Sequence, residues 1–104
     1  MDTMRGMWRP LTSDLAQEDM RPYFLWDEDT SIRELRTMLA SGDRERRIRY
    51  IAKIMREARD DDVWRFLSLG EVLDLWPELG PMLGRSRGFW EFMLDGWRRQ
   101  KLIA

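Results

Sequence analysis

Hydrophobic residues recur at helical spacing through the middle of the chain, most clearly over residues 43–59. Their side chains recur every three or four positions and together cover about 160° of a helix. They are Ile48, Ile51, Ala52, Ile54, Met55 and Ala58. Because Asp43 precedes this run as a helix cap, the pattern predicts a helix from there to about Arg59, with one face in the core.

The residues before this run predict a shorter helix. Ser31 and Glu34 are spaced as a capping box, in which each side chain accepts a hydrogen bond from the other residue's backbone N–H. Apolar residues follow on one face as far as Leu39, and Gly42 is a typical helix stop. We therefore expect a helix that begins after Ser31 and ends before Gly42.

Two further capping signals come after residue 59. Three aspartates at residues 60–62 stand where a helix would begin, and carboxylates there satisfy backbone N–H groups and complement the helix dipole. We interpret them as caps and expect no metal site. Ser68 and Glu71 form a second capping box, which predicts a helix through Trp76 that Pro77 bends or ends.

A last helix is expected over about residues 85–99, and its apolar face is unusually wide. Large apolar side chains cover roughly 200° of it, more than one core-facing stripe requires. They are Phe89, Trp90, Phe92, Met93, Leu94 and Trp97. We expect this helix to be either central in the fold or part of an interface.

These signals together predict an all-α fold, a small bundle of four to five short helices. No segment shows the alternation typical of strands. Residues 1–22 have no sustained period and contain Gly6, Pro10 and Pro22, so we expect a flexible N-terminal arm. Since 104 residues leave no room for a second domain, residues 23–104 are expected to form a single helical domain.

The composition removes most of the usual enzyme chemistry. The chain has no Cys and no His, so it has no thiol nucleophile, no imidazole base and no ordinary zinc ligands. We expect no catalytic residues, no cofactor and no enzyme activity. No stretch approaches the roughly 20 apolar residues that cross a bilayer, and the first residues have no signal-peptide core, so we expect a cytoplasmic protein that does not bind membranes.

The charge balance bears on nucleic-acid binding. With 18 basic and 19 acidic side chains the net charge is −1, whereas a dedicated nucleic-acid binder of this size is usually basic. The last helix could lie in a groove of DNA as a recognition helix, but Glu91 and Asp95 on its narrow polar face would repel phosphate. Nucleic-acid binding therefore stays open but is not favoured.

Four consecutive apolar residues at positions 23–26 form the first candidate for partner binding. Tyr23, Phe24 and Trp26 are large aromatic residues in a run too short for a helix and without a partner strand. Exposed patches of large aromatics are unusual on a monomer. The run therefore either packs onto the helices that follow it or meets a partner.

A cationic stripe on the long helix is the second candidate. Arg46, Arg49, Lys53 and Arg56 recur at steps of three and four residues, which places them on one stripe about 80° wide. Glu45 and Glu57 are spaced to pair with members of this stripe, in which case it is an ordinary solvated face. Otherwise it faces an acidic partner surface or a phosphate backbone.

Three aromatic-rich segments resemble a known family when they are taken in order. They are residues 21–27 (RPYFLWD), residues 48–67 with DDVWRFL at their end, and residues 86–94 (SRGFWEFML). This order resembles small prokaryotic helical proteins encoded beside a nucleotidyltransferase-like toxin of the abortive-infection type. The resemblance spans roughly residues 21–98. It implies an antitoxin that binds the folded toxin and neutralises it.

The resemblance and the residues together favour a protein-binding antitoxin or adaptor. Its partner-binding residues would be Tyr23, Phe24 and Trp26 as an apolar anchor, with Arg46, Arg49, Lys53 and Arg56 facing an acidic catalytic surface. Two alternatives stay open. One is a helical DNA-binding transcriptional regulator, and the other is a structural module that self-assembles into a homo-oligomer.

Overall fold

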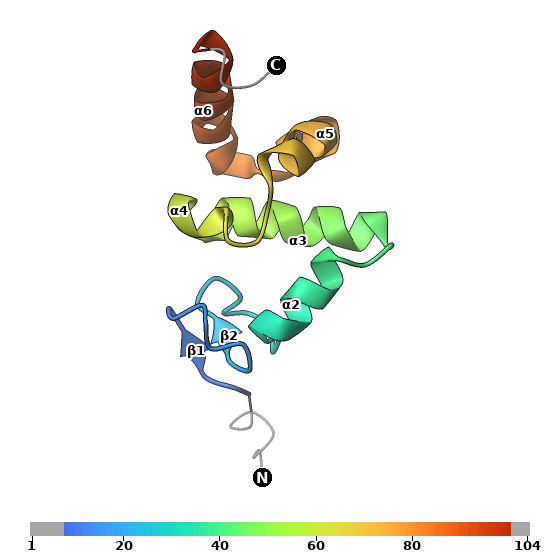
Figure 1. Cartoon of the computed structure of the whole chain (residues 1–104), viewed down its shortest axis with the longest axis vertical. Coiled ribbons are helices and arrows are strands. Elements are labelled where there is room, and N and C mark those ends of the chain that lie inside the picture. Colours follow the sequence, from blue (N-terminus) through green and yellow to red (C-terminus); the bar gives the residue numbers. More distant parts are fainter. Residues whose placement is uncertain (1–7, 101–104) are drawn as a thin grey trace. The chain divides into compact units, whose positions relative to one another are not determined.

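The computed structural model describes residues 8–100, and this part of the chain is mostly helical (Figure 1). The described residues contain five α-helices and one two-stranded parallel sheet. The helices are α2 (Ile32–Leu39), α3 (Arg44–Glu57), α4 (Asp60–Val63), α5 (Leu69–Leu79) and α6 (Arg87–Arg99). The strands are β1 (Leu11–Thr12) and β2 (Arg21–Pro22). The helical class is therefore confirmed, but the fold is not strictly all-α.

The chain divides into two compact units, Met1–Tyr50 and Ile51–Ala104, and the boundary falls inside α3. We call them unit 1 and unit 2. The single helical domain expected over residues 23–104 stays a prediction. The periodicity of α3 identifies its apolar face. It does not show which parts of the chain pack against each half of that face.

A short parallel β-sheet fixes the N-terminal part of unit 1. Leu11 lies opposite Arg21 and Thr12 opposite Pro22. The Arg21 N–H donates to the Pro10 carbonyl at 3.1 Å, and the Tyr23 N–H donates to the Thr12 carbonyl at 2.9 Å. Flexibility of residues 1–22 stays a prediction, of which residues 1–7 lie outside the described part. Residues 8–22 make specific contacts within unit 1.

Helix α2 begins as its capping box predicts. The Ser31 Oγ accepts from the Glu34 N–H at 3.1 Å, and the Glu34 Oε1 accepts from the Ser31 N–H at 2.9 Å. Buried apolar residues from the loop, α2 and the start of α3 form the core of unit 1. They are Leu15, Phe24, Leu25, Ile32, Leu35 and Ile48.

Unit 2 packs α4, α5 and α6 with the second half of α3 around a larger apolar core. The Ser68 Oγ caps α5 by accepting from the Glu71 N–H at 3.2 Å. Helix α5 continues past Pro77 to Leu79, so that proline does not end the helix. A proline this close to the C-terminus removes only one N–H donor from the helix, and the helix ends within the next turn.

Two short 3₁₀ turns, η1 (Gly80–Met82) and η2 (Gly84–Ser86), connect α5 to α6. Gly84 between them has a φ of +52°, a conformation that side chains with a Cβ rarely adopt. Trp90 of α6 is buried, and its indole Nε1 donates to the Met55 carbonyl at 2.9 Å. Within residues 8–100 no helix combines the length and the apolar character that a bilayer crossing requires.

Candidate functional site

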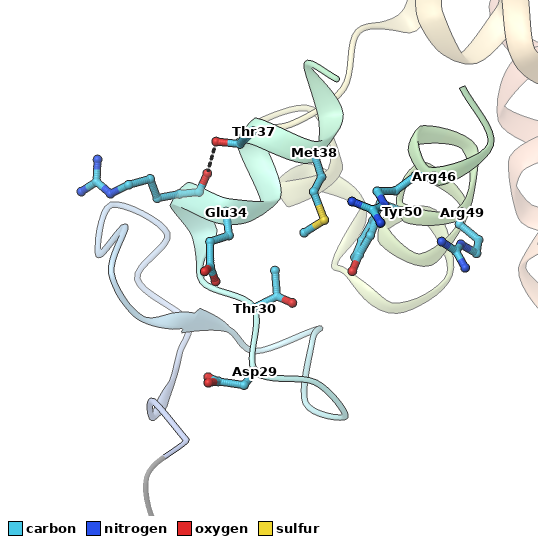
Figure 2. A pocket seen from close by; sticks show the side chains of 9 residues that line it. Asp29, Thr30, Glu34, Thr37, Met38, Arg46, Arg49 and Tyr50 are labelled. Atoms are coloured by element: carbon cyan, nitrogen blue, oxygen red, sulfur yellow. Dashed lines mark hydrogen bonds between the residues drawn. The ribbon is translucent and has the colours of Figure 1, made fainter. Parts of the chain in front are cut away.

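An open groove lies in unit 1 between α2, the first half of α3 and the loop before α2 (Figure 2). We call it the α2–α3 groove, and its volume is about 560 Å³. Figure 2 shows Met38 extending from α2, and Arg46 and Tyr50 from α3, into the space between the two helices, while Glu34 points from α2 towards the loop that carries Asp29. The lining residues are Asp29, Thr30, Arg33, Glu34, Thr37, Met38, Arg46, Arg49 and Tyr50.

The two acidic residues of the groove are held by a single arginine from the N-terminal segment. The Arg9 Nε donates to the Asp29 Oδ1 at 3.1 Å, and its Nη2 donates to the Glu34 Oε1 at 2.8 Å. The hydrogen bond from Arg9 lowers the pKa of Asp29. The pKa of Glu34 is lowered first by the Ser31 backbone N–H and then by Arg9. Both carboxylates are therefore stabilised in their charged form, and the single positive charge of Arg9 offsets part of their combined negative charge.

A hydroxyl pair fixes the position of a third carboxylate beside the groove. The Tyr50 hydroxyl donates to the Glu28 Oε1 at 2.6 Å, and the Thr30 Oγ1 donates to the same oxygen at 2.7 Å. Burial raises the pKa of Tyr50, and the hydrogen bond to Glu28 raises it further. Tyr50 therefore stays a neutral donor, and its ring forms part of the groove wall.

The cations of the groove differ in whether they have a partner. Arg33 lies 3.2 Å from the Asp19 Oδ1 and 3.8 Å from the Glu18 Oε1. Arg46 and Arg49 are exposed, and within residues 8–100 neither guanidinium makes an ion pair or a hydrogen bond. The lining cations without a described partner are therefore Arg46 and Arg49, which lie three residues apart on α3.

The structure separates the four members of the cationic stripe. Arg46 and Arg49 belong to the unit 1 half of α3 and line the groove. Lys53 and Arg56 belong to the unit 2 half, where Lys53 is half-buried. Arg56 donates to the Met82 carbonyl at 3.0 Å and lies 3.8 Å from Glu57. Half of the stripe is thus available for an anion, and Arg56 contributes to the packing of unit 2.

The expected pairing of Glu45 with Arg49 is absent from the described part of the chain. An exposed ion pair on a helix contributes little, because the Coulomb attraction in water is offset by the loss of side-chain freedom. Its absence leaves the Arg49 guanidinium available to a partner.

The aromatic run at residues 23–26 is divided between the core and the surface. Phe24 is 1% exposed and belongs to the core, so its assignment as a partner-binding residue does not fit this fold. Tyr23 is half-buried, with its ring edge-on to that of Phe24 at 5.3 Å. Trp26 is 61% exposed and is the one large aromatic of the run that a partner could bury extensively.

Sequence reasoning missed Arg9 and Tyr50. Arg9 lies in the expected arm, and its partners are 20 and 25 residues away, so no local spacing could reveal them. Tyr50 follows Arg49 directly and, at about 100° per residue, lies between the apolar face of α3 and the cationic stripe. That position beside the stripe is the sequence signal that could have placed Tyr50 at a polar site.

A second, smaller groove of about 330 Å³ lies in unit 2 and is lined by Trp76, Glu91, Leu94, Asp95 and Arg98. Its charged groups are already paired, because Glu91 lies 3.1 Å from Arg87 and Asp95 lies 3.5 Å from Arg98. Among residues 8–100, no three Asp or Glu side chains are placed to hold a metal ion.

The α2–α3 groove is suited to hold an anion. It presents two guanidinium groups that can each form bidentate hydrogen bonds with a carboxylate or phosphate, beside the apolar side chain of Met38. Comparison of the chain with protein-family models, with curated proteins and with solved structures found no match. The geometry of the groove therefore carries the functional argument.

Proposed function

We propose that the chain binds a protein partner through an acidic surface of that partner. The observation that carries this proposal is the pair of exposed arginines, Arg46 and Arg49, which have no partner among residues 8–100 and line a groove. Trp26, in the same unit, is 61% exposed. Arginine and tryptophan are the side chains that most often dominate the binding energy of protein interfaces.

The role that we propose for this binding is that of an antitoxin or adaptor that neutralises a nucleotidyltransferase-like toxin. Enzymes that bind divalent metal ions do so with carboxylates, so their catalytic face is acidic. Two arginines without a partner among residues 8–100 are complementary to such a face, and complementary charge increases both the rate and the specificity of association. The sequence motif at residues 21–27, which carries part of the family resemblance, lies in the same unit as the groove.

Co-purification tests the proposal. The full chain is expressed with a tagged nucleotidyltransferase-like toxin encoded beside it, and the eluate is analysed by size-exclusion chromatography with light scattering. We expect a stoichiometric complex. The double variant Arg46→Glu, Arg49→Glu should weaken it by about 100-fold or more, because two charge-assisted contacts become repulsive.

The matched control is the double variant Arg85→Glu, Arg99→Glu, which makes the same change in net charge within unit 2. Both residues are exposed. We expect this control to bind the toxin within about threefold of the unmodified chain, since neither Arg85 nor Arg99 lines the groove. Equal weakening by the two double variants would contradict a role for the groove.

Self-association is a second candidate function, and a separate observation favours it. Phe89 and Phe92 of α6 are 44% and 68% exposed. They lie three residues apart on a helix and therefore on neighbouring parts of one face. Light scattering of the chain alone tests this candidate: a concentration-dependent dimer that Phe92→Ser converts to a monomer would support it, and a monomer at all concentrations would exclude it.

A further inference from the structure

We propose that the α2–α3 groove binds a short acidic peptide segment that presents two carboxylates about one helical turn apart. The inference deepens the proposed protein-binding function and rests on it, because it names the chemistry of the partner segment that unit 1 recognises. It concerns the groove itself, which is formed by residues of unit 1.

The spacing of the two arginines sets the spacing of the carboxylates. Residues three apart on a helix have Cβ atoms about 5–6 Å apart and point to the same side. Arg46 and Arg49 are three residues apart within α3, and both line the groove. Each guanidinium can hold one carboxylate with two parallel hydrogen bonds. Two acidic side chains of one peptide segment match this arrangement.

The surroundings of the groove favour carboxylates over phosphates. Phosphate is typically bound by unoccupied backbone N–H groups at a helix N-terminus. Here the first turns of both helices are capped by their own side chains: Ser31 accepts from the Glu34 N–H at 3.1 Å, and Asp43 accepts from the Arg46 N–H at 3.1 Å. The backbone N–H groups of Glu34 and Arg46 in these first turns are therefore already bonded.

The negative groups at the other side of the groove also limit the charge of the ligand. Asp29 and Glu34 line it, and Glu28 lies beside it on the Tyr50 hydroxyl. A densely charged nucleic-acid backbone would meet these carboxylates as well as the arginines. A segment with only two carboxylates can place them on the arginines of α3 and its remaining side chains elsewhere in the groove.

The walls provide apolar surface for the stems of those acidic side chains. Met38 extends from α2 and the Tyr50 ring from α3 into the groove (Figure 2). Its volume of about 560 Å³ is within the range of about 300–1,000 Å³ that is typical of ligand pockets. The groove is thus large enough for a few side chains and carries both charge and apolar contact area.

Titration of the full chain with a synthetic peptide tests the inference. The probe is a fluorescein-labelled helical peptide whose only charged side chains are two glutamates three positions apart, and the reference peptide has glutamine at both positions. Fluorescence anisotropy should show the glutamate peptide binding at least about tenfold more tightly, and Arg46→Gln with Arg49→Gln should abolish this difference. Equal binding of the two peptides would overturn the inference.

A matched pair of variants on the opposite wall tests the place of binding. Thr37 lines the groove from α2, and its hydroxyl donates only to the Arg33 carbonyl of its own helix at 3.1 Å. Thr37→Lys should tighten binding of the glutamate peptide about threefold, and Thr37→Glu should weaken it by a similar factor. If neither variant changes the affinity, the peptide does not occupy the groove and the inference fails.

Phosphate ligands are the competing outcome. A labelled single-stranded oligonucleotide and inorganic pyrophosphate are titrated at the same salt concentration, and tighter binding of either than of the glutamate peptide would overturn the choice of carboxylates.

The experiments distinguish failure of the peptide inference from failure of the proposed function. If the peptide does not bind but Arg46→Glu with Arg49→Glu still breaks the toxin complex, protein binding stands and only the peptide inference falls.

Discussion

The two units of the chain are held together in different ways. In unit 1, ion pairs connect residues that are far apart in the sequence, such as Arg9 with Asp29 and Glu34. In unit 2, three ion pairs join residues only three or four positions apart, as in Arg87 with Glu91. Unit 2 instead contains a chain of aromatic contacts in which Trp64 meets both Trp90 and Trp97, at 5.8 and 6.0 Å.

Because of this difference, we expect unit 1 to contribute mainly to partner binding and unit 2 mainly to the stability of the fold. Unit 1 uses long-range polar contacts to hold the acidic side chains of its groove, whereas Arg46 and Arg49 line the groove without a partner among residues 8–100. Unit 2 buries more large apolar side chains, and burial of apolar surface is the dominant favourable term in folding. We therefore expect substitutions in unit 2 to act mainly on stability, and polar substitutions in unit 1 to act mainly on binding.

The largest effect should come from removing buried aromatic side chains. Trp90→Ala in unit 2 and Phe24→Ala in unit 1 should each lower the free energy of unfolding by about 3–5 kcal/mol, because each leaves a cavity. Trp90→Ala also leaves the Met55 carbonyl without its donor. Urea unfolding followed by circular dichroism measures both.

The controls are the exposed aromatics of the same two units. Phe92→Ala and Trp26→Ala should each change the free energy of unfolding by no more than about 0.5 kcal/mol, since their side chains are mostly in water. Trp26→Ala should still weaken the toxin complex. A large loss of stability in Trp26→Ala would place this tryptophan in the fold and not at the partner surface.

Helix capping should give an intermediate effect that differs between the units. Ser31→Ala should cost about 1–2 kcal/mol and Ser68→Ala about 0.5–1 kcal/mol. The reason is that both bonds of the Ser31 capping box are formed, whereas Ser68 accepts one bond from the Glu71 N–H. Thermal unfolding of the two variants measures the difference, and a greater loss in Ser68→Ala would contradict it.

The smallest effect should be a pH dependence confined to unit 1. The pKa values of Asp29 and Glu34 lie below their ordinary values of 3.8 and 4.5, so their charged forms stabilise the folded chain above those values. This stabilisation is lost as the pH falls below about 4.5 towards the lowered values. Arg9→Met should reduce the decline of the Tm between about pH 5 and about pH 3.

Part of this decline should persist in Arg9→Met, because the Ser31 N–H is the main cause of the lowered pKa of Glu34. Arg85→Met serves as the control, since Arg85 is an exposed arginine of unit 2. If Arg9→Met and Arg85→Met have the same pH profile, Arg9 does not stabilise the two carboxylates.

Most of the helical structure could be predicted because its signals are local. The capping box at Ser31 and the cap at Asp43 form as their spacing predicts, and one of the two bonds of the box predicted at Ser68 forms, from the Glu71 N–H to the Ser68 Oγ. The apolar face of α3 is buried where the periodicity places it. The end of α5 could not be predicted from Pro77, because the cost of one missing N–H bond near a helix end depends on how the end packs.

The candidate site could be predicted only in part. The stripe on α3 identified Arg46 and Arg49, but it also included Arg56, whose guanidinium donates a hydrogen bond to the Met82 carbonyl. The aromatic run identified Trp26, but it also included Phe24, which is buried. In each case the pattern identified the residue types. Which of them stay exposed is decided by burial, as for Phe24, or by a contact with a distant residue, as for Arg56 with the Met82 carbonyl.

The sequence by itself determined the helices, their caps and their apolar faces, because these depend on interactions between residues one to four positions apart. Only the tertiary structure decided the pairing of β1 with β2, the ion pairs of Arg9 with Asp29 and Glu34, and the place of Arg46 and Arg49 in the lining of the α2–α3 groove. These features join residues 10 to 25 positions apart, and their formation depends on how the whole of unit 1 packs.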